Sequence, residues 1–464
     1  MRTLDYIEHH YQAILDDLIA FARIPSVSTD PAYAEGIRGG AAWVADRLRR
    51  AGLADAAIRE TEGHPVVTAS WLGAPGAPTI LIYGHYDVQP PDPADRWITP
   101  AFEPTIRNDR LYARGVSDDK GPVLIPMVVA EAFLATEGKL PINVKFLIEG
   151  EEELGSAHLE AFVAAHAEEL AADFVLSADG AMWRADLPTI TVASRGICTV
   201  EFSVDGASKD LHSGRHGGSA PNPLHAVGRL VASLHDDNGQ VAVAGFYDGM
   251  RPVGNAQRIA IADIPFDEGD YLDEIGAAGP GGENGYSLLE RNWIRPTLEL
   301  NGLWGGYSGP GSKTVIPATA HAKISCRLVP GQDPRAVQLA IQAHLEAHCP
   351  PSFRISVTTP DHLALPYAIE DDHRGLLLAE QVLTDVLGRA PLRVRMGATI
   401  PIGEIFKRVL GLDTVFFSFS TVDEDYHAPN EFFRLSSLKN GLRAWVDYWS
   451  RLGGQHAGQE VSTR

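Results

Sequence analysis

Four apolar segments of the sequence each lead into histidine or acidic residues. Thr79–Tyr83 is followed by Gly-His-Tyr-Asp-Val, and Asn143–Ile148 by Glu-Gly-Glu-Glu-Glu. Phe174–Leu176 leads to Ser-Ala-Asp, and Val415–Phe417 leads a few residues later to Asp-Glu-Asp-Tyr-His. Ligand sites of α/β sheets lie beyond the carboxyl ends of the strands, which is where these polar groups fall. The pattern predicts a hydrolytic metal site at one edge of a sheet.

Helical and strand patterns alternate up to about residue 190. Helical periodicity covers Leu4–Ala22, Gly39–Ala51, Gly121–Thr136 and Ser156–Glu169. Between these segments lie the short apolar runs Val66–Trp71, Thr79–Tyr83, Val144–Ile148 and Phe174–Leu176. Such alternation predicts an α/β domain, with a mostly parallel sheet covered by helices.

A second kind of pattern interrupts this domain. The chain of 464 residues is too long for one core, so we expect two domains, with three conceivable. From 193 to 364 the pattern is α+β, with strands at Cys198–Val204, His321–Leu328 and Arg354–Thr358, helices at Pro223–Leu234 and Pro334–His348, and an unassigned stretch at 240–310. The α/β pattern then returns, with a helix at Gly375–Leu387, a strand at Val415–Phe419 and a helix at Leu435–Leu452. We therefore predict a catalytic domain formed by 1–192 and 365–464, interrupted by an inserted domain at 193–364.

Charge and cysteine usage restrict the partners and the compartment. The formal net charge of −21 argues against nucleic acid and anionic membranes as partners. No apolar run reaches the length of a membrane span, and the first residues lack the apolar core of a secretory signal. The three cysteines have no CxxC spacing, which argues against a disulfide framework and a structural zinc site. We expect a cytoplasmic protein.

Two of the polar segments have both a functional and a structural interpretation. His85 and Asp87 are two residues apart, so in extended backbone their side chains point the same way, and Asp87 could orient a metal-bound His85. The alternative is a His-Asp hydrogen bond in a turn. Asp118 and Asp119 lie between a short strand at Arg110–Arg114 and a helix that begins near Gly121. They could bind metal, or they could cap the helix, for which Asp is favoured.

The remaining acidic groups strengthen the metal interpretation when all are taken together. Glu151, Glu152 and Glu153 repel one another unless cations neutralise them, although a solvated loop would also accommodate them. Asp179 and His427 are weak signals singly. Two histidines and several carboxylates without thiolates favour zinc, manganese or cobalt. Because the carboxylates exceed what one ion can neutralise, we expect two divalent metal ions, about 3.5–4 Å apart and bridged by one carboxylate.

At this point the sequence resembles a known family, the M20 metallopeptidases. Five segments, in matching order and spacing, carry the resemblance: Gly84–Val88, Ser117–Pro122, Glu149–Ser156, Asp210–Gly214 and His427–Glu431. The resemblance extends from about residue 5 to 452. Lys209–Gly214 and Ser312–Pro317 are most similar to the carnosinase-like dipeptidase branch of that family.

The resemblance implies a role for each metal ligand. His85 and Asp179 would bind one ion, His427 and Glu153 would bind the other, and Asp118 would bridge the two. Glu152 would act as the general base and Asp87 would orient His85. The family also places a cis peptide before the residue that corresponds to Asp119.

For the inserted domain, the resemblance implies a lid that also forms a homodimer. His212 is similar to the histidine that a partner subunit lends to the active site, where it stabilises an oxyanion. Arg327 is similar to an arginine that binds the terminal carboxylate of the substrate, and Thr314 lies in a matching segment. Thr399 lies in a segment near that carboxylate, in which Ala398 replaces a family glycine.

The expected activity is metal-dependent hydrolysis of the amide bond in dipeptides or short peptides that carry a free C-terminal carboxylate. An alternative with the same site is an N-acyl-amino-acid deacylase or desuccinylase. A more remote alternative is a non-catalytic metal-binding scaffold, although every ligand position and the base are filled. A two-metal phosphoesterase would need more Lys or Arg around the metals than Lys120 alone.

Overall fold

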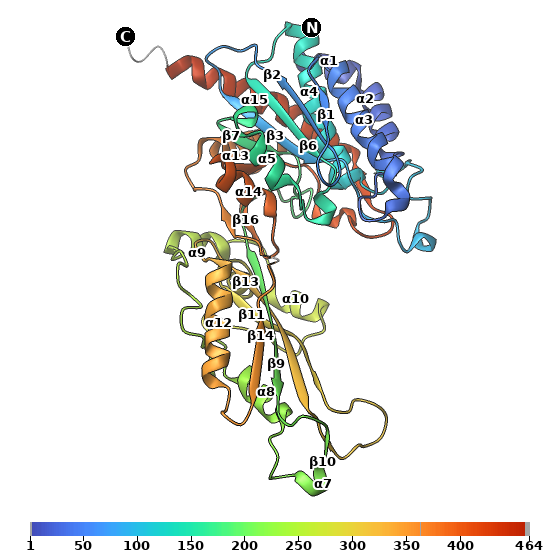
Figure 1. Ribbon diagram of the computed structural model, residues 1–464. Coiled ribbons are helices and arrows are strands. Elements are labelled where there is room, and N and C mark those ends of the chain that lie inside the picture. Colours follow the sequence, from blue (N-terminus) through green and yellow to red (C-terminus); the bar gives the residue numbers. More distant parts are fainter. Residues whose placement is uncertain (1, 362, 460–464) are drawn as a thin grey trace. The chain divides into compact units, whose positions relative to one another are not determined.

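The protein divides into two compact units. A computed structural model describes residues 2–361 and 363–459 (Figure 1). The first unit contains residues up to Val192, Ile369–Val394 and the chain from Ile402 onward. The second contains Ala193–Ala368 and Arg395–Pro401, and so includes 365–368 and 395–401, which lie outside the range expected for the inserted domain. Among the described residues, no helix combines the length and the apolar character needed to cross a membrane.

A six-stranded sheet forms the centre of the first unit. Its strands, in spatial order, are β1 (Ala57–Arg59), β2 (Val66–Trp71), β6 (Asn143–Glu149), β3 (Thr79–His85), β7 (Phe174–Ser177) and β17 (Thr414–Phe416). The pairs β6–β3, β3–β7 and β7–β17 are parallel, and β2 pairs antiparallel with both β1 and β6. Within this sheet β2 alone therefore runs against the other strands. The predicted α/β class with a mostly parallel sheet is confirmed.

Helices cover both faces of this sheet. They are α1 (Thr3–His9), α2 (Tyr11–Ala22), α3 (Ala34–Arg50), α4 (Gly121–Glu137), α5 (Leu159–Ala165), α6 (Ala167–Leu170), α13 (Arg374–Leu387), α14 (Pro401–Leu410) and α15 (Leu435–Gln459). Successive residues of β3 show the two faces. A Cβ on Gly84 would lie 2.8 Å from Val123 of α4, whereas the Tyr83 ring meets Phe406 of α14 edge-on at 5.4 Å. Both faces of β3 are thus buried, which explains its unbroken apolar sequence.

Two of the predicted helices are each broken into two. The helix expected at Leu4–Ala22 is α1 followed by α2, and the helix expected at Ser156–Glu169 is α5 followed by α6. A histidine stands at each break, with ψ of 9° at His10 and 22° at His166. Each ring approaches, through Nδ1, the carbonyl four residues earlier, at 2.8 Å and 2.9 Å. Apolar periodicity continues across both breaks, so it did not reveal them.

Short elements complete the first unit. A small antiparallel sheet contains β4 (Thr105–Arg107), β5 (Arg110–Tyr112) and β18 (Phe432–Arg434). Single helical turns lie at Pro31–Tyr33, Ala94–Arg96, Glu152–Leu154 and Val422–Glu424, and an irregular turn at Val116–Lys120 precedes α4. The chain passes from one unit to the other four times, within β8 (Thr189–Ser194), after β15 (Tyr367–Ala368), within β16 (Leu392–Met396) and after Pro401. These three strands form a sheet in the order β15, β8, β16.

The second unit is a four-stranded antiparallel sheet with helices. The strand order is β11 (Thr297–Gly305), β13 (Thr319–Leu328), β9 (Gly196–Asp205) and β14 (Arg354–Thr358). Buried residues alternate along β9 and β13, and their buried face packs with residues of α8 (Pro223–Ala232) and α12 (Pro334–His348) in one apolar core. In Figure 1, α12 runs alongside this sheet. The opposite face of the sheet carries polar side chains, including Arg327, and remains partly exposed.

The remaining elements of the second unit include several within the stretch 240–310 that the sequence left unassigned. These are α9 (Asn255–Ala262), α10 (Glu268–Glu274), α11 (Leu288–Trp293) and the strand β11. A two-stranded ladder pairs β10 (Leu211–His212) with β12 (Val315–Ile316), and α7 (Ser213–His216) follows β10. This ladder brings the segment of His212 beside that of Thr314, whose carbonyl accepts a hydrogen bond from the Ser213 amide at 2.9 Å.

Candidate active site

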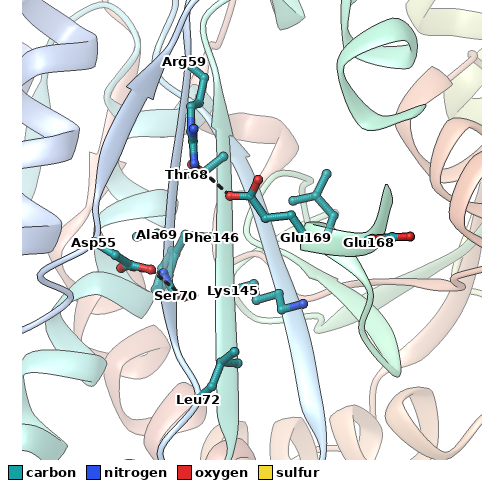
Figure 2. A pocket seen from close by; sticks show the side chains of 11 residues that line it. Asp55, Arg59, Thr68, Ala69, Ser70, Leu72, Lys145, Phe146, Glu168 and Glu169 are labelled. Atoms are coloured by element: carbon teal, nitrogen blue, oxygen red, sulfur yellow. Dashed lines mark hydrogen bonds and ion pairs between the residues drawn. The ribbon is translucent and has the colours of Figure 1, made fainter. Parts of the chain in front are cut away.

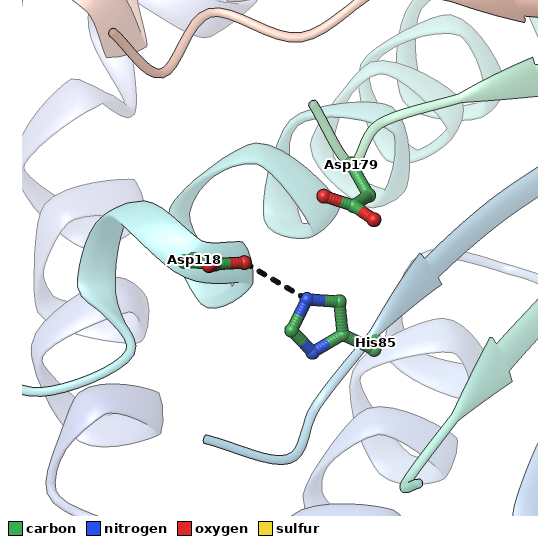
Figure 3. Close-up of side chains that lie close together, drawn as sticks. All are labelled: His85, Asp118 and Asp179. Atoms are coloured by element: carbon green, nitrogen blue, oxygen red, sulfur yellow. Dashed lines mark hydrogen bonds and ion pairs between the residues drawn. The ribbon is translucent and has the colours of Figure 1, made fainter. Parts of the chain in front are cut away.

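Two groups of potential metal ligands share one residue, Asp118. One group contains His85, Asp118 and Asp179, and the other contains Asp118, Glu153 and His427. Within each group the ligand atoms all lie within 4.8 Å of one another. Figure 3 shows Asp118 and Asp179 turned toward the His85 ring. The five residues come from strand ends and loops of the first unit that are far apart in sequence.

Asp118 contacts both imidazoles through different oxygens. Its Oδ1 lies 3.0 Å from His85 Nε2, and its Oδ2 lies 3.1 Å from His427 Nε2. His427 Nε2 is also 3.1 Å from Glu153 Oε2. A carboxylate between two imidazoles is the arrangement that a bridging metal ligand requires.

The motif Gly84–Asp87 fixes the His85 ring. His85 is the last residue of β3 and is fully buried. Its Nδ1 lies 3.0 Å from the Asp87 carbonyl and 3.3 Å from Asp87 Oδ1, which leaves Nε2 directed at Asp118. Asp119 Oδ2 accepts a hydrogen bond from the His85 amide at 3.2 Å, and a Cβ on Gly84 would approach that oxygen to 2.7 Å. Glycine at 84 is therefore required by the space that Asp119 occupies.

Asp87 has a second set of contacts. Its Oδ1 accepts a hydrogen bond from the Glu152 amide at 3.2 Å, and its Oδ2 accepts one from the Glu153 amide at 3.1 Å. One buried carboxylate therefore holds His85 and the backbone of the two glutamates in a fixed relation. The alternative interpretation, a His-Asp contact confined to a turn, does not account for these two contacts.

Helix capping does not explain the acidic pair. The residue before α4 is Lys120, whose side chain makes no capping hydrogen bond. The peptide between Asp118 and Asp119 is cis, as the resemblance implies. The Asp118 amide instead donates to Glu431 Oε1 at 3.2 Å. The backbone of this turn is therefore held from outside the helix.

Glu431 is a residue whose role sequence reasoning missed. Its buried carboxylate accepts hydrogen bonds from the amides of Gly115 and Ser117, at 2.8 and 2.9 Å, in addition to that of Asp118. Arg114 Nη1 completes the set at 2.8 Å. Glu431 thereby ties the segment of His427 to the turn that carries Asp118. The position of Glu431 in the segment His427–Glu431 was the one sequence signal of a functional role. No local pattern reveals that its carboxylate binds Arg114 and the amides of the turn.

The loop that carries His427 has an unusual backbone conformation. His427 has φ of +62°, a left-handed value that is uncommon for residues with a side chain and that is found at functional sites. Asn430 anchors this loop, because its Oδ1 accepts from the Ile98 amide at 2.8 Å and its Nδ2 donates to the Arg96 carbonyl at 3.0 Å. Gln89 is a further contact that the sequence did not indicate, with Nε2 2.7 Å from Glu153 Oε2.

Uncompensated negative charge marks the site. Burial, together with repulsion from Asp118 and Glu153, raises the pKa of Asp179 to about 6. Burial likewise raises the pKa of Glu153, and it raises that of Glu152 well above its usual range. Hydrogen bonds to Asp118 and Glu153 raise the pKa of His427 to about 10. Buried carboxylates that crowd together in this way call for cations, so the residues present fit divalent metal ions.

The site is closed on one side and open on the other. The His85 side chain is fully buried, whereas 50% of the His427 side chain is exposed and the Asp118 side chain is 22% exposed. Small molecules can therefore approach from the side of His427.

A pocket elsewhere in the first unit does not coincide with the motifs. Figure 2 shows it beside β1, β2 and β6, with residues of α6 on its rim. Arg59 pairs with Glu169 at 3.0 Å, Ser70 donates to Asp55 at 2.5 Å, and Lys145 donates to the Ala171 carbonyl at 2.6 Å. These polar groups are engaged with one another or with the backbone, and we assign the pocket no function.

The other predicted site residues lie in the second unit and form two pairs. His212 and Thr314 are both exposed and are brought together by the ladder of β10 and β12. Arg327 Nη1 donates a hydrogen bond to Thr399 Oγ1 at 2.9 Å.

Comparison with known proteins identifies the family. The family model for peptidase family M20/M25/M40 matches residues 81–451. The chain belongs to this family. It is 29% identical to the Beta-Ala-His dipeptidase of Mus musculus, over 99% of this chain and 97% of that protein. It is 28% identical to the Cys-Gly metallodipeptidase DUG1 of Saccharomyces cerevisiae, over 92% of this chain and 93% of that protein.

Solved structures of the M20 family share the fold of this chain. An M20 metallo-carboxypeptidase from Sulfolobus solfataricus is 30% identical, with a TM-score of 0.78 over 95% of this chain and 99% of that chain. Human carnosine dipeptidase 1 is 29% identical, with a TM-score of 0.73 over 97% of this chain and 98% of that chain. The predicted resemblance to M20 enzymes, and to their carnosinase-like branch, is confirmed.

Replacement of Asp118 tests the metal centre. We expect Asp118→Asn to remove the shared anionic ligand, so that metal content after dialysis falls from about two ions per chain to one or none. Elemental analysis of the purified protein measures this content. Asp186→Asn is the matched control, because Asp186 is exposed and pairs with Arg184 through its side chain. Retention of two ions by the Asp118 variant would contradict the bridging role.

Proposed function

We propose that this chain is a metal-dependent dipeptidase, which hydrolyses the amide bond of dipeptides or short peptides that carry a free C-terminal carboxylate. The observation that carries the proposal is the pair of ligand groups that share Asp118. Support for the substrate class comes from the names of the relatives, which include a Beta-Ala-His dipeptidase and Cys-Gly metallodipeptidases. Deacylation of N-acyl amino acids is not favoured, because none of these names describes a deacylase.

The donor set indicates which ions the site would hold. His85, Asp179 and Asp118 would hold one ion, and His427, Glu153 and Asp118 the other. Imidazole and carboxylate donors without thiolate suit zinc best, with manganese or cobalt as alternatives. When bound, the two ions would supply Lewis acidity, which lowers the pKa of a coordinated water and polarises the scissile carbonyl.

Glu152 would move the proton during hydrolysis. It would accept a proton from the attacking water and then donate it to the nitrogen of the leaving amine, so that the amide bond is exchanged for a carboxylate and a free amine. The hydrogen bonds from the Glu152 and Glu153 amides to Asp87 support this assignment. They hold a base and a metal ligand side by side, at a fixed position relative to His85.

His212 would donate a hydrogen bond to the oxyanion. The Gly214 amide donates to its Nδ1 at 3.0 Å, so the neutral ring carries its proton on Nε2, where it can be donated. The side chain is exposed. Following the family pattern, we infer that His212 serves the active site of a second copy of this chain. There its hydrogen bond would stabilise negative charge on the carbonyl oxygen of the substrate.

The second unit would form the homodimer. Its edge strand β11 exposes Leu303 and Trp304 by 51% and 46%, and the Tyr307 side chain that follows is also exposed. An exposed edge strand with large apolar side chains is suited to pairing with another chain. We assign this surface to the dimer contact.

Arg327 and Thr399 would bind the substrate carboxylate. A guanidinium matches a carboxylate with two parallel hydrogen bonds, and the contact from Arg327 to Thr399 supports a joint role. Thr314 would contribute from the segment beside His212.

The reduced state of two buried cysteines supports a reducing compartment. Cys198 and Cys326 face each other across β9 and β13, both buried and both free. Because disulfides are rare in the cytosol, we propose a cytoplasmic location.

A substrate panel tests the proposed function. We expect the purified protein to hydrolyse dipeptides, to be inactivated by a chelator, and to recover with added zinc, manganese or cobalt. Product analysis would compare dipeptides and tripeptides with N-acyl amino acids under one metal. Preferential cleavage of the N-acyl amino acids would favour a deacylase, and absence of any metal-dependent hydrolysis would favour a non-catalytic scaffold.

Replacement of the proposed base tests the mechanism. Glu152→Gln should retain both ions but lose about 10²–10⁴-fold of kcat, because general-base catalysis contributes on that scale. Steady-state kinetics with a dipeptide, alongside elemental analysis, measures both properties. Glu160→Gln is a suitable control, since Glu160 lies on α5 and pairs with Arg408 at the surface. Turnover near that of the unmodified enzyme would refute the assignment.

Subunit mixing tests the lent histidine. Glu152→Gln and His212→Ala should each be nearly inactive alone, while a mixed dimer contains one intact site and regains part of the activity. Activity is followed after subunit exchange, and exchange itself is verified with differently labelled chains. If verified exchange restores no activity, each site uses its own His212.

A further inference from the structure

Two arginines of the second unit lie near the start of β9. Arg327 of β13 pairs directly with Ile197 of β9, and Arg195 is the single residue between the end of β8 and the start of β9. Arg195 is only 7% exposed, and burial followed by the charge of Arg327 lowers its pKa to about 10.

Arg195 holds three successive residues of the loop that leads to Thr399. Its amide lies 3.3 Å from the Met396 carbonyl and 3.1 Å from the Ala398 carbonyl, and its Nε donates to the Gly397 carbonyl at 2.7 Å. The next residue, Thr399, accepts the hydrogen bond from Arg327. Arg195 thus fixes the loop that leads to Thr399, and Thr399 is the hydrogen-bond acceptor of Arg327.

Asn292 completes this arrangement. Its Oδ1 accepts from Arg195 Nη2 at 3.0 Å, and a Cβ on Gly397 would lie 2.3 Å from the same oxygen. Asn292 therefore touches both the arginine and the loop. A side chain at 397 would therefore have to displace the Asn292 side chain.

The contacts of Arg195 leave part of its hydrogen-bonding capacity unused. Its Nη1 is buried and has no hydrogen-bond partner in the part of the chain that the structure describes. The side-chain contacts that it does make are with a carbonyl and an amide oxygen rather than with a carboxylate. A buried guanidinium with an unused donor lowers the stability of the folded state. Stability alone therefore does not explain an arginine at position 195.

We propose that Arg195 is a positioning residue for substrate selection, which holds the loop Met396–Ala398 so that Thr399 and Arg327 are set to bind the substrate carboxylate. This inference rests on the proposed function, since it requires that Arg327 reads that carboxylate. The side-chain contacts to the Gly397 carbonyl and to Asn292, rather than the charge alone, carry the effect.

The test compares a dipeptide with its C-terminal amide in steady-state kinetics. Arg195→Lys keeps the charge but cannot reproduce the contacts to Gly397 and Asn292. We expect its KM for the dipeptide to rise about tenfold or more, the scale of a lost charge-assisted hydrogen bond, with kcat within about threefold of the parent. The amide, which lacks the carboxylate, should be cleaved as by the parent. Metal content should remain at the parent value.

Two reference variants separate the inference from the function on which it rests. Arg327→Met should abolish the preference for the acid over the amide. If it does not, or if the parent enzyme shows no such preference, carboxylate reading by Arg327 fails, and the inference fails with it. If Arg327→Met abolishes the preference but Arg195→Lys retains it, the inference alone is overturned. Arg354→Lys, an exposed arginine of β14, is the control for the substitution itself.

A second variant covers the case in which Arg195→Lys does not fold. Asn292→Ala removes the acceptor for Nη2 and the side chain against Gly397, without removing a buried charge. It should raise the KM for the dipeptide and leave the amide unaffected. Combined with Thr399→Ala, it should cause no further loss, because both act through the same loop. An additive loss in the double variant, or an unchanged KM in the single one, overturns the proposal.

Discussion

The Asp118 carboxylate, with one oxygen toward His85 and the other toward His427, is the contact on which the architecture of the site depends. It joins a strand end of the central sheet to a loop more than three hundred residues later in the sequence. The surrounding structure keeps it there. Glu431 holds the amides of the preceding turn, and Arg114 shares the same buried carboxylate. The bridging role proposed for Asp118 needs a fixed backbone on both sides, and a single glutamate supplies much of that restraint.

Asp87 provides a comparable restraint for catalysis. The Asp87 carboxylate, which contacts His85, also accepts hydrogen bonds from the amides of Glu152 and Glu153, so one side chain ties the proposed ligands to the proposed base. Geometry of this kind matters because small displacements of a base or ligand cost large factors in rate. In the second unit, Arg195 plays a comparable part. It binds the loop that leads to Thr399, and Thr399 accepts a hydrogen bond from Arg327.

Much of the first unit could be predicted from the sequence, because its strands are continuous apolar runs and its motifs lie at their ends. β2 has the predicted limits, as does α12 in the second unit, and the five ligand candidates fall into the two groups that share Asp118. The breaks at His10 and His166 were missed, since a ring contact to a nearby carbonyl leaves no trace in apolar periodicity. β11 was missed because Gly, Asn and charged residues in and around it obscure its alternation. Contacts such as those of Glu431 and Arg195 depend on segments that only the tertiary fold brings together.

The unequal burial of the two imidazoles has a consequence for how the centre fills and empties. An ion held by His85 would be enclosed by protein, whereas one held by His427, half exposed on a left-handed loop residue, would face solvent. The two halves would then differ in exchange rate, with a retained inner ion and a labile outer one. Occupancy of the outer position would then respond to the free metal concentration, while the inner position stays filled.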